Sequence, residues 1–461
     1  MFHIRLFTFY PFGVKQPQKG LNVNSHRFHL WNLLTINKLI IIEMRIEQLH
    51  LENIGVFDRL SLQFQQCKQA DKAEIHIFAG ENGTGKSTLL YALAGAFSSD
   101  RALISKRFRN VEQTWVELKT DMKGYKYFED TKSSLPSLFY TQSAQLLEYE
   151  DLIHNYRKNV FKLAVFAYAG NRSLKSHHLV GIKEITESPF EGSLSFNSTE
   201  SLILMQWVAN NKAKAAIAQV KNEPKKAAKY QTAIQLIEAA LTEIVGFKVE
   251  FELETEPEFK IELKINGQAL EFEVLADGLK SIVSWISDLF MRMDRIPWID
   301  DCSILERRFI LFLDEIDIHL HPVWQRKILP VVQKLFPNAQ IFVSSHSPFV
   351  VASISDAYVY KFRLENGVSR LETVEESKAG SSYSLVLDEI FAIDELFDVE
   401  TESEFDRFYQ LEDDIMHGHN EKIPLFLEVA RQLMEKGIES REIVGIELRQ
   451  MSRILNKNFS V

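Results

Sequence analysis

The sequence has few cysteines, only Cys67 and Cys302 in 461 residues. They lie far apart, and neither belongs to a spacing that is used for metal ligation or redox chemistry. The sequence therefore gives no sign of a disulfide framework. A reducing, cytoplasmic location is the expectation that follows.

The sequence also lacks a long apolar run. The stretch "NLLTINKLIII" at 32–42 is short, and it is interrupted by Thr35, Asn37 and Lys38. A helix that crosses a bilayer needs about twenty consecutive, mostly apolar residues. We therefore expect no membrane partner, and a transporter ATPase subunit is a poor match.

The N-terminus lacks the ordered charged, apolar and small-residue regions of a signal peptide. In contrast, Met44 opens the segment "MRIEQLHLENIGVFDRLSLQF", whose alternating apolar residues suit a first strand and its neighbour. We expect residues 1–43 to be upstream translation or a loose extension, and the folded chain to begin at Met44.

No block of the sequence is strongly basic. The net charge is −10. From residue 376 onward there are 19 acidic and 9 basic residues, whereas the preceding part has 44 of each. Composition thus provides no electrostatic footprint for nucleic acid, although a basic patch formed by folding stays possible. The acidic, helical end of the chain is a candidate surface for a partner.

Internal repeats and low-complexity tracts are absent as well. The helical pattern at 200–245 is interrupted by Pro224 and is too short for the long coiled-coil arms of some ATPases. Short apolar runs such as "EIHIFAG", "RFILFLDE" and "AQIFVSSHSP" are typical of parallel strands that are covered on both faces. With alternating strands elsewhere, they predict an α/β protein with a mixed sheet.

A phosphate-binding loop is the clearest motif. "GENGTGKS" matches G-x-x-x-x-G-K-[ST], follows the apolar run "EIHIFAG" and opens a helical pattern. Its glycines allow close phosphate approach, and its N–H groups point at the β-phosphate. Lys86 supplies charge to the β- and γ-phosphates, and the Ser87 hydroxyl coordinates Mg²⁺. The residues predicted to bind ATP here are Gly80, Glu81, Asn82, Gly83, Thr84, Gly85, Lys86, Ser87 and Thr88.

An acidic pair follows a second apolar strand in "FILFLDE". Asp314, at the strand end, is predicted to bind Mg²⁺ directly or through water, and Glu315 to act as the general base on the attacking water. The 228 residues between Lys86 and Asp314 are too many for a compact GTPase-like domain. An insertion between the two motifs is expected.

Histidines supply a third part of the pattern. "IFVSSHSP" places His346 at the end of a neighbouring strand, where its imidazole can hydrogen-bond the γ-phosphate. The segment "DEIDIHLHP" also allows a metal site that includes His319 and His321. Because Pro322 starts a helical pattern, we expect a turn instead. The two histidines and Asp317 are then expected to face a second subunit.

These motifs, with "FAYAGNRSL" and "LADGLKSIVSWISDLFMRM", resemble the RecF/SMC-like ABC ATPases in their AAA-type branch. Within that branch the chain is similar to ATP-binding proteins associated with virulence and anti-phage defence, including Septu- and retron-associated ATPases. The resemblance covers roughly 44–365. It implies that the phosphate loop is Walker A, that Asp314 and Glu315 are Walker B, and that His346 is the switch histidine.

The resemblance also implies an ABC signature in "LADGLKS", with Asp277 and Gly278 contacting the γ-phosphate held by an opposite subunit. The family usually has a serine where this chain has Ala276, so hydrolysis is expected to be slow. A glutamine loop is not obvious: Gln142 and Arg172 are both candidates, and Arg172 is preferred because it follows a buried strand.

The expected fold is thus a P-loop NTPase of ABC/SMC-RecF type with a helical and β-hairpin insertion between Walker A and the signature, and a helical tail. We expect an extension at 1–43, an N-terminal ATPase part at 44–174, an insertion at 175–274, a part with signature, Walker B and switch histidine at 275–375, and an acidic helical region at 376–461.

The resulting hypothesis is an ATPase that dimerises around ATP and Mg²⁺ and switches a separate effector, such as a nuclease, in anti-phage defence. Two alternatives are kept. A RecF-like DNA-binding ATPase would bind DNA in a salt-sensitive manner. An OLD-like nuclease would need a metal-binding domain after the ATPase, where the sequence looks helical.

Overall fold

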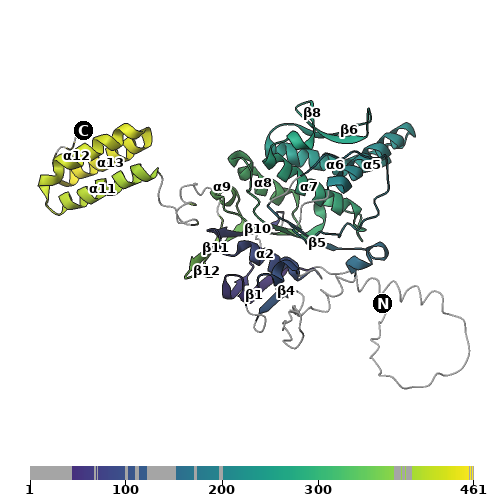
Figure 1. Cartoon of the computed structure of the whole chain (residues 1–461), viewed down its shortest axis with the longest axis horizontal. Helices are drawn as coiled ribbons and strands as arrows, with labels where there is room; N and C mark the ends of the chain where they lie inside the picture. The colour runs from purple at the N-terminus through teal and green to yellow at the C-terminus, as the bar shows by residue number, and fades with distance from the viewer. Residues whose placement is uncertain are drawn as a thin grey trace, which may run out of the picture.

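A computed structural model describes most of the chain (Figure 1). The described residues are 44–66, 69, 71–98, 102–109, 114–121, 152–170, 174–196, 201–377, 386, 390, 397–455, 457 and 459. The predictions made for 1–43, Gln142 and Arg172 lie outside these residues.

A six-stranded sheet forms the centre, in the order β12-β11-β3-β10-β9-β5. The strands from β11 to β5 run parallel, and β12 pairs antiparallel with β11. Their bounds are β3 Glu74–Gly80, β5 Leu163–Tyr168, β9 Arg308–Leu313, β10 Ala339–Ser344, β11 Ala357–Glu365 and β12 Val368–Glu376. Because β3, β5 and β10 are buried at every position, the prediction of strands covered on both faces is confirmed.

A second sheet, in the order β2-β1-β4, is antiparallel. It consists of β1 Ile46–Ile54, β2 Phe57–Gln63 and β4 Trp115–Thr120. The alternation read from the sequence appears in β2, where Phe57, Leu60 and Leu62 are buried between exposed neighbours. A hydrogen bond from the Ser369 N–H to the Val56 carbonyl oxygen, 2.8 Å long, joins this sheet to β12.

Helices cover the central sheet on both faces (Figure 1). Figure 1 shows α2 on the side of the three-stranded sheet, with α7 and α8 on the other side. The bounds are α2 Lys86–Gly95, α3 Ala102–Ser105, α7 Asp277–Arg295, α8 Pro322–Leu335 and α9 Pro348–Val351. Single 3₁₀ turns occur at η1 Tyr156–Lys158, η2 Phe272–Val274, η3 Ile304–Glu306 and η4 Asn420–Lys422.

The segment between the two nucleotide motifs contains a helical hairpin and a small sheet. The helices are α5 Ser201–Val220 and α6 Pro224–Val245, and the strands are β6 Val249–Glu254, β7 Lys260–Ile265 and β8 Gln268–Leu270. The turn at Asn266-Gly267 joins β7 to β8, with φ of 47° and 89°. Apolar residues of α5 and α6 belong to the same continuous core as the central sheet.

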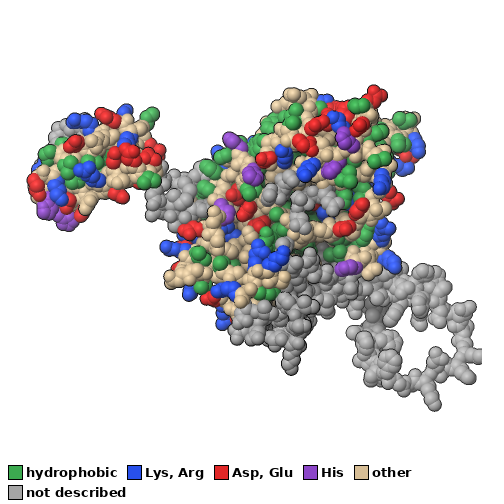
Figure 2. Space-filling model, in the orientation of Figure 1, with side chains coloured by type: hydrophobic (Ala, Val, Ile, Leu, Met, Phe, Trp, Pro, Cys, Tyr) green, Lys and Arg blue, Asp and Glu red, His purple; other side chains and the backbone are tan. Residues whose placement is uncertain are grey.

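The C-terminal helices form a core of their own. These helices are α11 Val399–Met416, α12 Ile423–Lys436 and α13 Ile438–Leu455. Phe408, Phe426 and Met451 lie at the centre of this second cluster. Figure 2 shows acidic and basic side chains interspersed over the visible face of the chain. Among the described helices, none is both long and apolar enough to cross a bilayer.

A buried polar cluster lies at the edge of the central sheet where the parallel strands begin. The Glu74 carboxylate accepts two hydrogen bonds from Arg45, of 2.8 and 2.9 Å, and one of 2.7 Å from Gln340. His76 Nε2 lies 2.7 Å from the same carboxylate, and its Nδ1 lies 3.2 Å from the Tyr360 hydroxyl. Burial lowers the pKa of His76, against the opposing effect of Glu74. The cluster ties β1, β3, β10 and β11 together.

Candidate functional site

The phosphate loop connects β3 to α2, and its glycines are required by its shape. Gly80 has a φ of 136°, and a Cβ there would lie 2.2 Å from the Phe362 carbonyl oxygen. Gly85 has a φ of 88°, and a Cβ there would lie 2.6 Å from the Phe57 ring. Both positions therefore combine a left-handed backbone with a close approach that only glycine allows.

Lys86 starts α2 and is only 4% exposed. Its ammonium donates hydrogen bonds of 2.8 Å to the Gly80 carbonyl and 2.7 Å to the Glu81 carbonyl. Burial lowers the pKa of Lys86 to about 8, although the nearby carboxylates of Asp317 and Asp314 oppose this shift. A buried ammonium with this low pKa gains from any additional negative charge that is placed beside it.

Asp314 follows the last residue of β9 and is 4% exposed. Its Oδ1 accepts hydrogen bonds from the hydroxyls of Ser87, at 2.9 Å, and Ser344, at 2.5 Å. Its Oδ2 accepts one of 3.2 Å from the hydroxyl of Tyr91. Burial, together with the charge of Asp314, raises the pKa of Tyr91 to about 12, so this hydroxyl stays protonated. The carboxylate is thus oriented by several hydroxyl groups.

Glu315 has a left-handed backbone, with a φ of 47°. For a non-glycine residue such a conformation stores strain, which the surrounding structure has to support. Here the Glu315 N–H donates a 2.8 Å hydrogen bond to the Ser344 hydroxyl. Gly170, just after β5, lies so close that a Cβ on it would be 2.6 Å from the Glu315 Cβ and 3.0 Å from its Oε2. The position of this carboxylate is therefore set by neighbours on β5 and β10.

His346 follows β10 and is half-buried. Burial, with the positive charge of Lys86, lowers the pKa of its imidazole, which hydrogen-bonds the backbone of Gly80. The backbone N–H of His346 donates a long hydrogen bond, 3.4 Å, to Asp317 Oδ2. The other oxygen of Asp317, Oδ1, is buried and has no hydrogen-bond partner among the described residues. Asp317 therefore lies near Lys86 and His346. The sequence had instead suggested that it faces outward together with His319 and His321.

The two histidines occupy different positions in the turn after Glu315. His319 has a φ of 62°, and its carbonyl oxygen lies 2.4 Å from where a Cβ on Gly278 would be. His321 caps α8, since its Nδ1 accepts from the Val323 N–H at 3.3 Å. The predicted turn before a helix is confirmed. In the described part of the chain, no group of three or more His, Cys, Asp or Glu side chains is arranged to hold a metal.

The signature residues form a second group beside this turn. Ala276 is the N-cap of α7 and has no side-chain hydrogen bond to offer, whereas serine is among the preferred residues there. Asp277 is largely exposed and lies 3.3 Å from the Lys280 ammonium. Gly278 is buried against His319.

The structure thus brings Lys86, Ser87, Asp314, Glu315 and His346 into one group at the ends of β3, β9 and β10. Of the other predicted residues, Glu81 and Asn82 are exposed in the loop, Gly83 has a φ of 84° and Thr84 donates to the Glu81 carbonyl at 2.8 Å. Thr88 is buried and packs against Gly55.

Sequence reasoning missed Tyr91 and the position of Asp317 near Lys86. Tyr91 lies four residues after Ser87 on α2, and that spacing is a signal for a shared helix face. Asp317 lies two residues after Glu315, inside the turn, where its direction could not be read from periodicity.

Two family models match the chain. One, described as "AAA domain, putative AbiEii toxin, Type IV TA system", matches residues 142–352. Another, described as "AAA domain", matches residues 44–99. The first range contains the signature, the acidic pair and His346, and the second contains the phosphate loop.

Three similar proteins show how far the likeness extends. The Septu protein PtuA of Bacillus thuringiensis is 24% identical over 437 residues, which cover 89% of this chain and 99% of that protein. The retron Ec83 probable ATPase of Escherichia coli is 31% identical over 28% of this chain and 23% of its own length. The retron Vc95 probable ATPase of Vibrio cholerae serotype O1 biovar El Tor is 32% identical over 22% of this chain and 20% of its own length.

Solved structures of SMC heads also align with the chain. The SMC head domain from Thermotoga maritima gives a TM-score of 0.38 at 16% identity, covering 72% of this chain and 99% of that one. An SMC head bound to the C-terminal winged-helix domain of ScpA gives a TM-score of 0.42 at 13% identity, and the alignment covers 72% of this chain and 98% of that one. These scores are too low to carry an argument, so the fold assignment rests on the sheet order and the phosphate loop. AAA models thus match the segments that hold both parts of the site, and the chain is similar to a Septu protein over most of its length and to retron ATPases over shorter stretches.

Proposed function

We propose that the chain hydrolyses ATP, dimerises around it, and acts as a conformational switch for a separate effector in bacterial anti-phage defence. The observation that carries this proposal is the convergence of Lys86, Asp314, Glu315 and His346 at one edge of the central sheet. ATP hydrolysis needs a positive charge for the phosphates, a carboxylate for Mg²⁺ and a base for the attacking water. The ammonium of Lys86 and the carboxylates of Asp314 and Glu315 can supply these three functions next to the phosphate loop.

The phosphate loop and Lys86 are proposed to bind the phosphates of ATP. The ammonium already lies among backbone carbonyls, and negative phosphate oxygens would offset the burial that lowers its pKa. The Ser87 hydroxyl and the Asp314 carboxylate are hard oxygen ligands of the kind that Mg²⁺ prefers. Bound Mg²⁺ would neutralise charge on the β- and γ-phosphate oxygens.

Glu315 is proposed as the general base, and His346 as a contact to the γ-phosphate. Glu315 is adjacent to the proposed metal carboxylate, and the close packing of Gly170 limits where its side chain can lie. The lowered pKa of His346 keeps its imidazole neutral near pH 7. A neutral ring carries one N–H that can donate to a phosphate oxygen.

The proposed dimer is head to tail, with the signature of each subunit facing the ATP of the other. In support, Asp277 is exposed at the N-terminus of α7, a 19-residue helix whose dipole favours an anion there. His319 and His321 are exposed beside it. The absence of a hydroxyl at Ala276 is expected to make hydrolysis slow.

The role in defence is proposed from the relatives, which include a Septu protein and two retron ATPases. The three C-terminal helices, with their separate core and excess of acidic residues, are the proposed docking unit for an effector such as a nuclease, in a cytoplasmic setting. The helical character of residues 399–455 does not favour an OLD-like nuclease. DNA binding is kept as an outcome of the test.

The experiment compares wild type with Glu315→Gln. If Glu315 is the base, turnover of ATP falls at least about 100-fold, since general bases contribute 10²–10⁴-fold. The closed dimer should then accumulate with ATP and Mg²⁺, which light scattering on a sizing column would detect. Glu365→Gln, at an exposed position in the same sheet, is the matched control.

Normal turnover in Glu315→Gln would show that another group is the base. A wild type that stays monomeric with ATP would contradict the dimer. Binding of DNA that depends on ATP and weakens steeply with salt would favour the RecF-like alternative instead.

A further inference from the structure

We propose that Tyr91 is a positioning residue for the Mg²⁺ site, because its hydroxyl fixes the orientation of the Asp314 carboxylate. The inference rests on the proposed function, in which Asp314 and Ser87 hold the metal. It adds a residue that lies outside the phosphate loop and the acidic pair.

The two oxygens of Asp314 are used by different donors. Oδ1 accepts from Ser87 and Ser344, whereas Oδ2 accepts from Tyr91. Ser87 is itself a proposed metal ligand, whereas Ser344 and Tyr91 hold the carboxylate from outside the metal shell. With one donor on each oxygen, the carboxylate plane is fixed against rotation about its Cβ–Cγ bond. Partners of metal ligands commonly set metal affinity in this way.

The helix α2 delivers Ser87 and Tyr91 to the same carboxylate. The two residues are four apart, so they lie on one face of the helix, one turn above the other. Any shift of α2 therefore moves both hydroxyls together relative to β9. This arrangement couples the start of the phosphate loop helix to the metal carboxylate.

The ring of Tyr91 is held on two sides. Phe196 packs against it edge to face, with ring centroids 4.4 Å apart at 75°. The Arg107 guanidinium lies over the ring, 4.3 Å from its centroid. Packing of this kind leaves the hydroxyl little freedom to turn away from Asp314.

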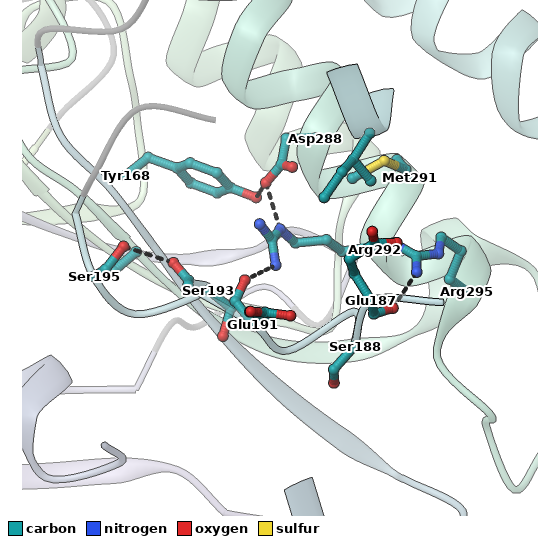
Figure 3. Close-up of a pocket in the computed structure, with 13 residues that line it drawn as sticks. Tyr168, Glu187, Ser188, Glu191, Ser193, Ser195, Asp288, Met291, Arg292 and Arg295 are labelled. Carbon is teal, nitrogen blue, oxygen red and sulfur yellow. Dashed lines mark hydrogen bonds and ion pairs between the residues drawn. The ribbon is translucent and has the colours of Figure 1, made fainter. Parts of the chain in front are cut away.

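Phe196 follows a short stretch, residues 189–191, that is anchored on the signature helix α7. Arg292 of α7 donates to the carbonyls of Pro189, at 2.8 Å, and Glu191, at 2.7 Å. It also pairs with Asp288, which in turn accepts from the Tyr168 hydroxyl (Figure 3). A small cavity of about 150 Å³ lies between this segment and α7. The helix α7 thus helps to hold the segment that places Phe196 against the Tyr91 ring.

Packing alone does not explain a tyrosine at position 91. A phenylalanine would make the same ring contacts with Phe196 and Arg107. A hydroxyl that is half-buried beside a carboxylate contributes only if it forms the hydrogen bond, since its desolvation otherwise costs free energy. The hydroxyl is therefore assigned to Asp314.

The test uses Tyr91→Phe in the full chain, with Mn²⁺ as a spectroscopic probe. Electron paramagnetic resonance of Mn²⁺ with ADP present measures metal affinity without hydrolysis. We expect a dissociation constant about tenfold higher than in wild type, since losing such a partner costs about 10–100-fold. The Mg²⁺ concentration for half-maximal ATP turnover should rise by a similar factor. Nucleotide affinity in excess EDTA should not change.

Tyr230→Phe is the matched control, because Tyr230 lies on α6, and the Lys214 ammonium lies over its ring, 5.8 Å from the centroid. Phe196→Leu keeps the hydroxyl but removes the edge-to-face contact, and it should weaken Mn²⁺ binding by a smaller factor. Unchanged Mn²⁺ affinity in Tyr91→Phe overturns the inference, even if wild type hydrolyses ATP. A wild type that binds no Mg²⁺–nucleotide at all contradicts the proposed function itself.

Discussion

The two edges of the central sheet both carry buried polar side chains, and they differ in how these groups are paired. Where the parallel strands begin, Glu74 is bonded to Arg45, His76 and Gln340. Where the strands end, Lys86 is held by backbone carbonyls, and Asp317 has a buried oxygen without a hydrogen-bond partner among the described residues.

The difference distinguishes the paired polar cluster from the polar groups of the proposed nucleotide site. At the first edge the charges are neutralised by one another, as buried charges in a stable core have to be. At the second edge the ammonium has a lowered pKa, and one glutamate has a strained backbone. Burial also lowers the pKa of His76 at the first edge, so the strained backbone of Glu315 distinguishes the second edge better than a shifted pKa does. Strain of this kind accumulates at sites that meet a ligand.

Glu74→Ala should give the largest effect at the structural edge. It leaves Arg45, His76 and Gln340 without their shared acceptor, and breaking a buried pair costs about 3–5 kcal/mol. Chemical denaturation should show this loss of stability. Glu365→Ala, exposed at the end of β11, should change stability by less than about 0.5 kcal/mol. A loss of ATP affinity at temperatures where Glu74→Ala is fully folded would break the comparison between the edges.

Gly170→Ala should act at the functional edge without a comparable loss of stability. The new Cβ would collide with Glu315, and misplacement of a catalytic group by about 1 Å costs about 100-fold in rate. We expect ATP turnover to fall by this factor while ATP affinity stays the same. Gly437→Ala is the control, because Gly437 is extended, with a φ of −174°, and its nearest atom lies 3.7 Å from the added Cβ. Equal turnover in the two variants would show that Gly170 does not fix the base.

ATP affinity should depend on pH through Lys86, with the smallest effect of the three. The pKa of Lys86 is about 8, so the side chain is charged below that pH and loses its proton above it. Binding at higher pH must take up a proton, so affinity should fall by up to about tenfold per pH unit above 8. Calorimetry would measure this. Lys86→Arg should show no such fall, because arginine stays protonated.

Much of the fold could be predicted because its signals are local. The apolar runs at β3, β9 and β10 and the break in the helical pattern at Pro224 all appear at the positions that the sequence indicates. The phosphate loop and the acidic pair follow from fixed spacing, and strand ends in a parallel sheet bring them together. Their proposed roles remain predictions.

Contacts between distant segments could not be predicted. Tyr91 faces Asp314 only because β9 lies beside β10 and β5 in the sheet, and no periodicity records that order. The direction of Asp317 depends on the left-handed turn at Glu315. The helices α5 and α6 lie within the predicted insertion, and their apolar faces enter the common core through contacts that the sequence does not specify.

The position of β3 between β10 and β11 has a consequence for synthesis of the chain. Glu74 and its partner Gln340 are 266 residues apart, so the strand that precedes the phosphate loop has no neighbours in the sheet until late in translation. At about 5–20 residues per second, that interval lasts about 15–50 s on the ribosome. We therefore expect the proposed nucleotide site to form only after β10 has been synthesised, and the apolar β3 to need protection until then.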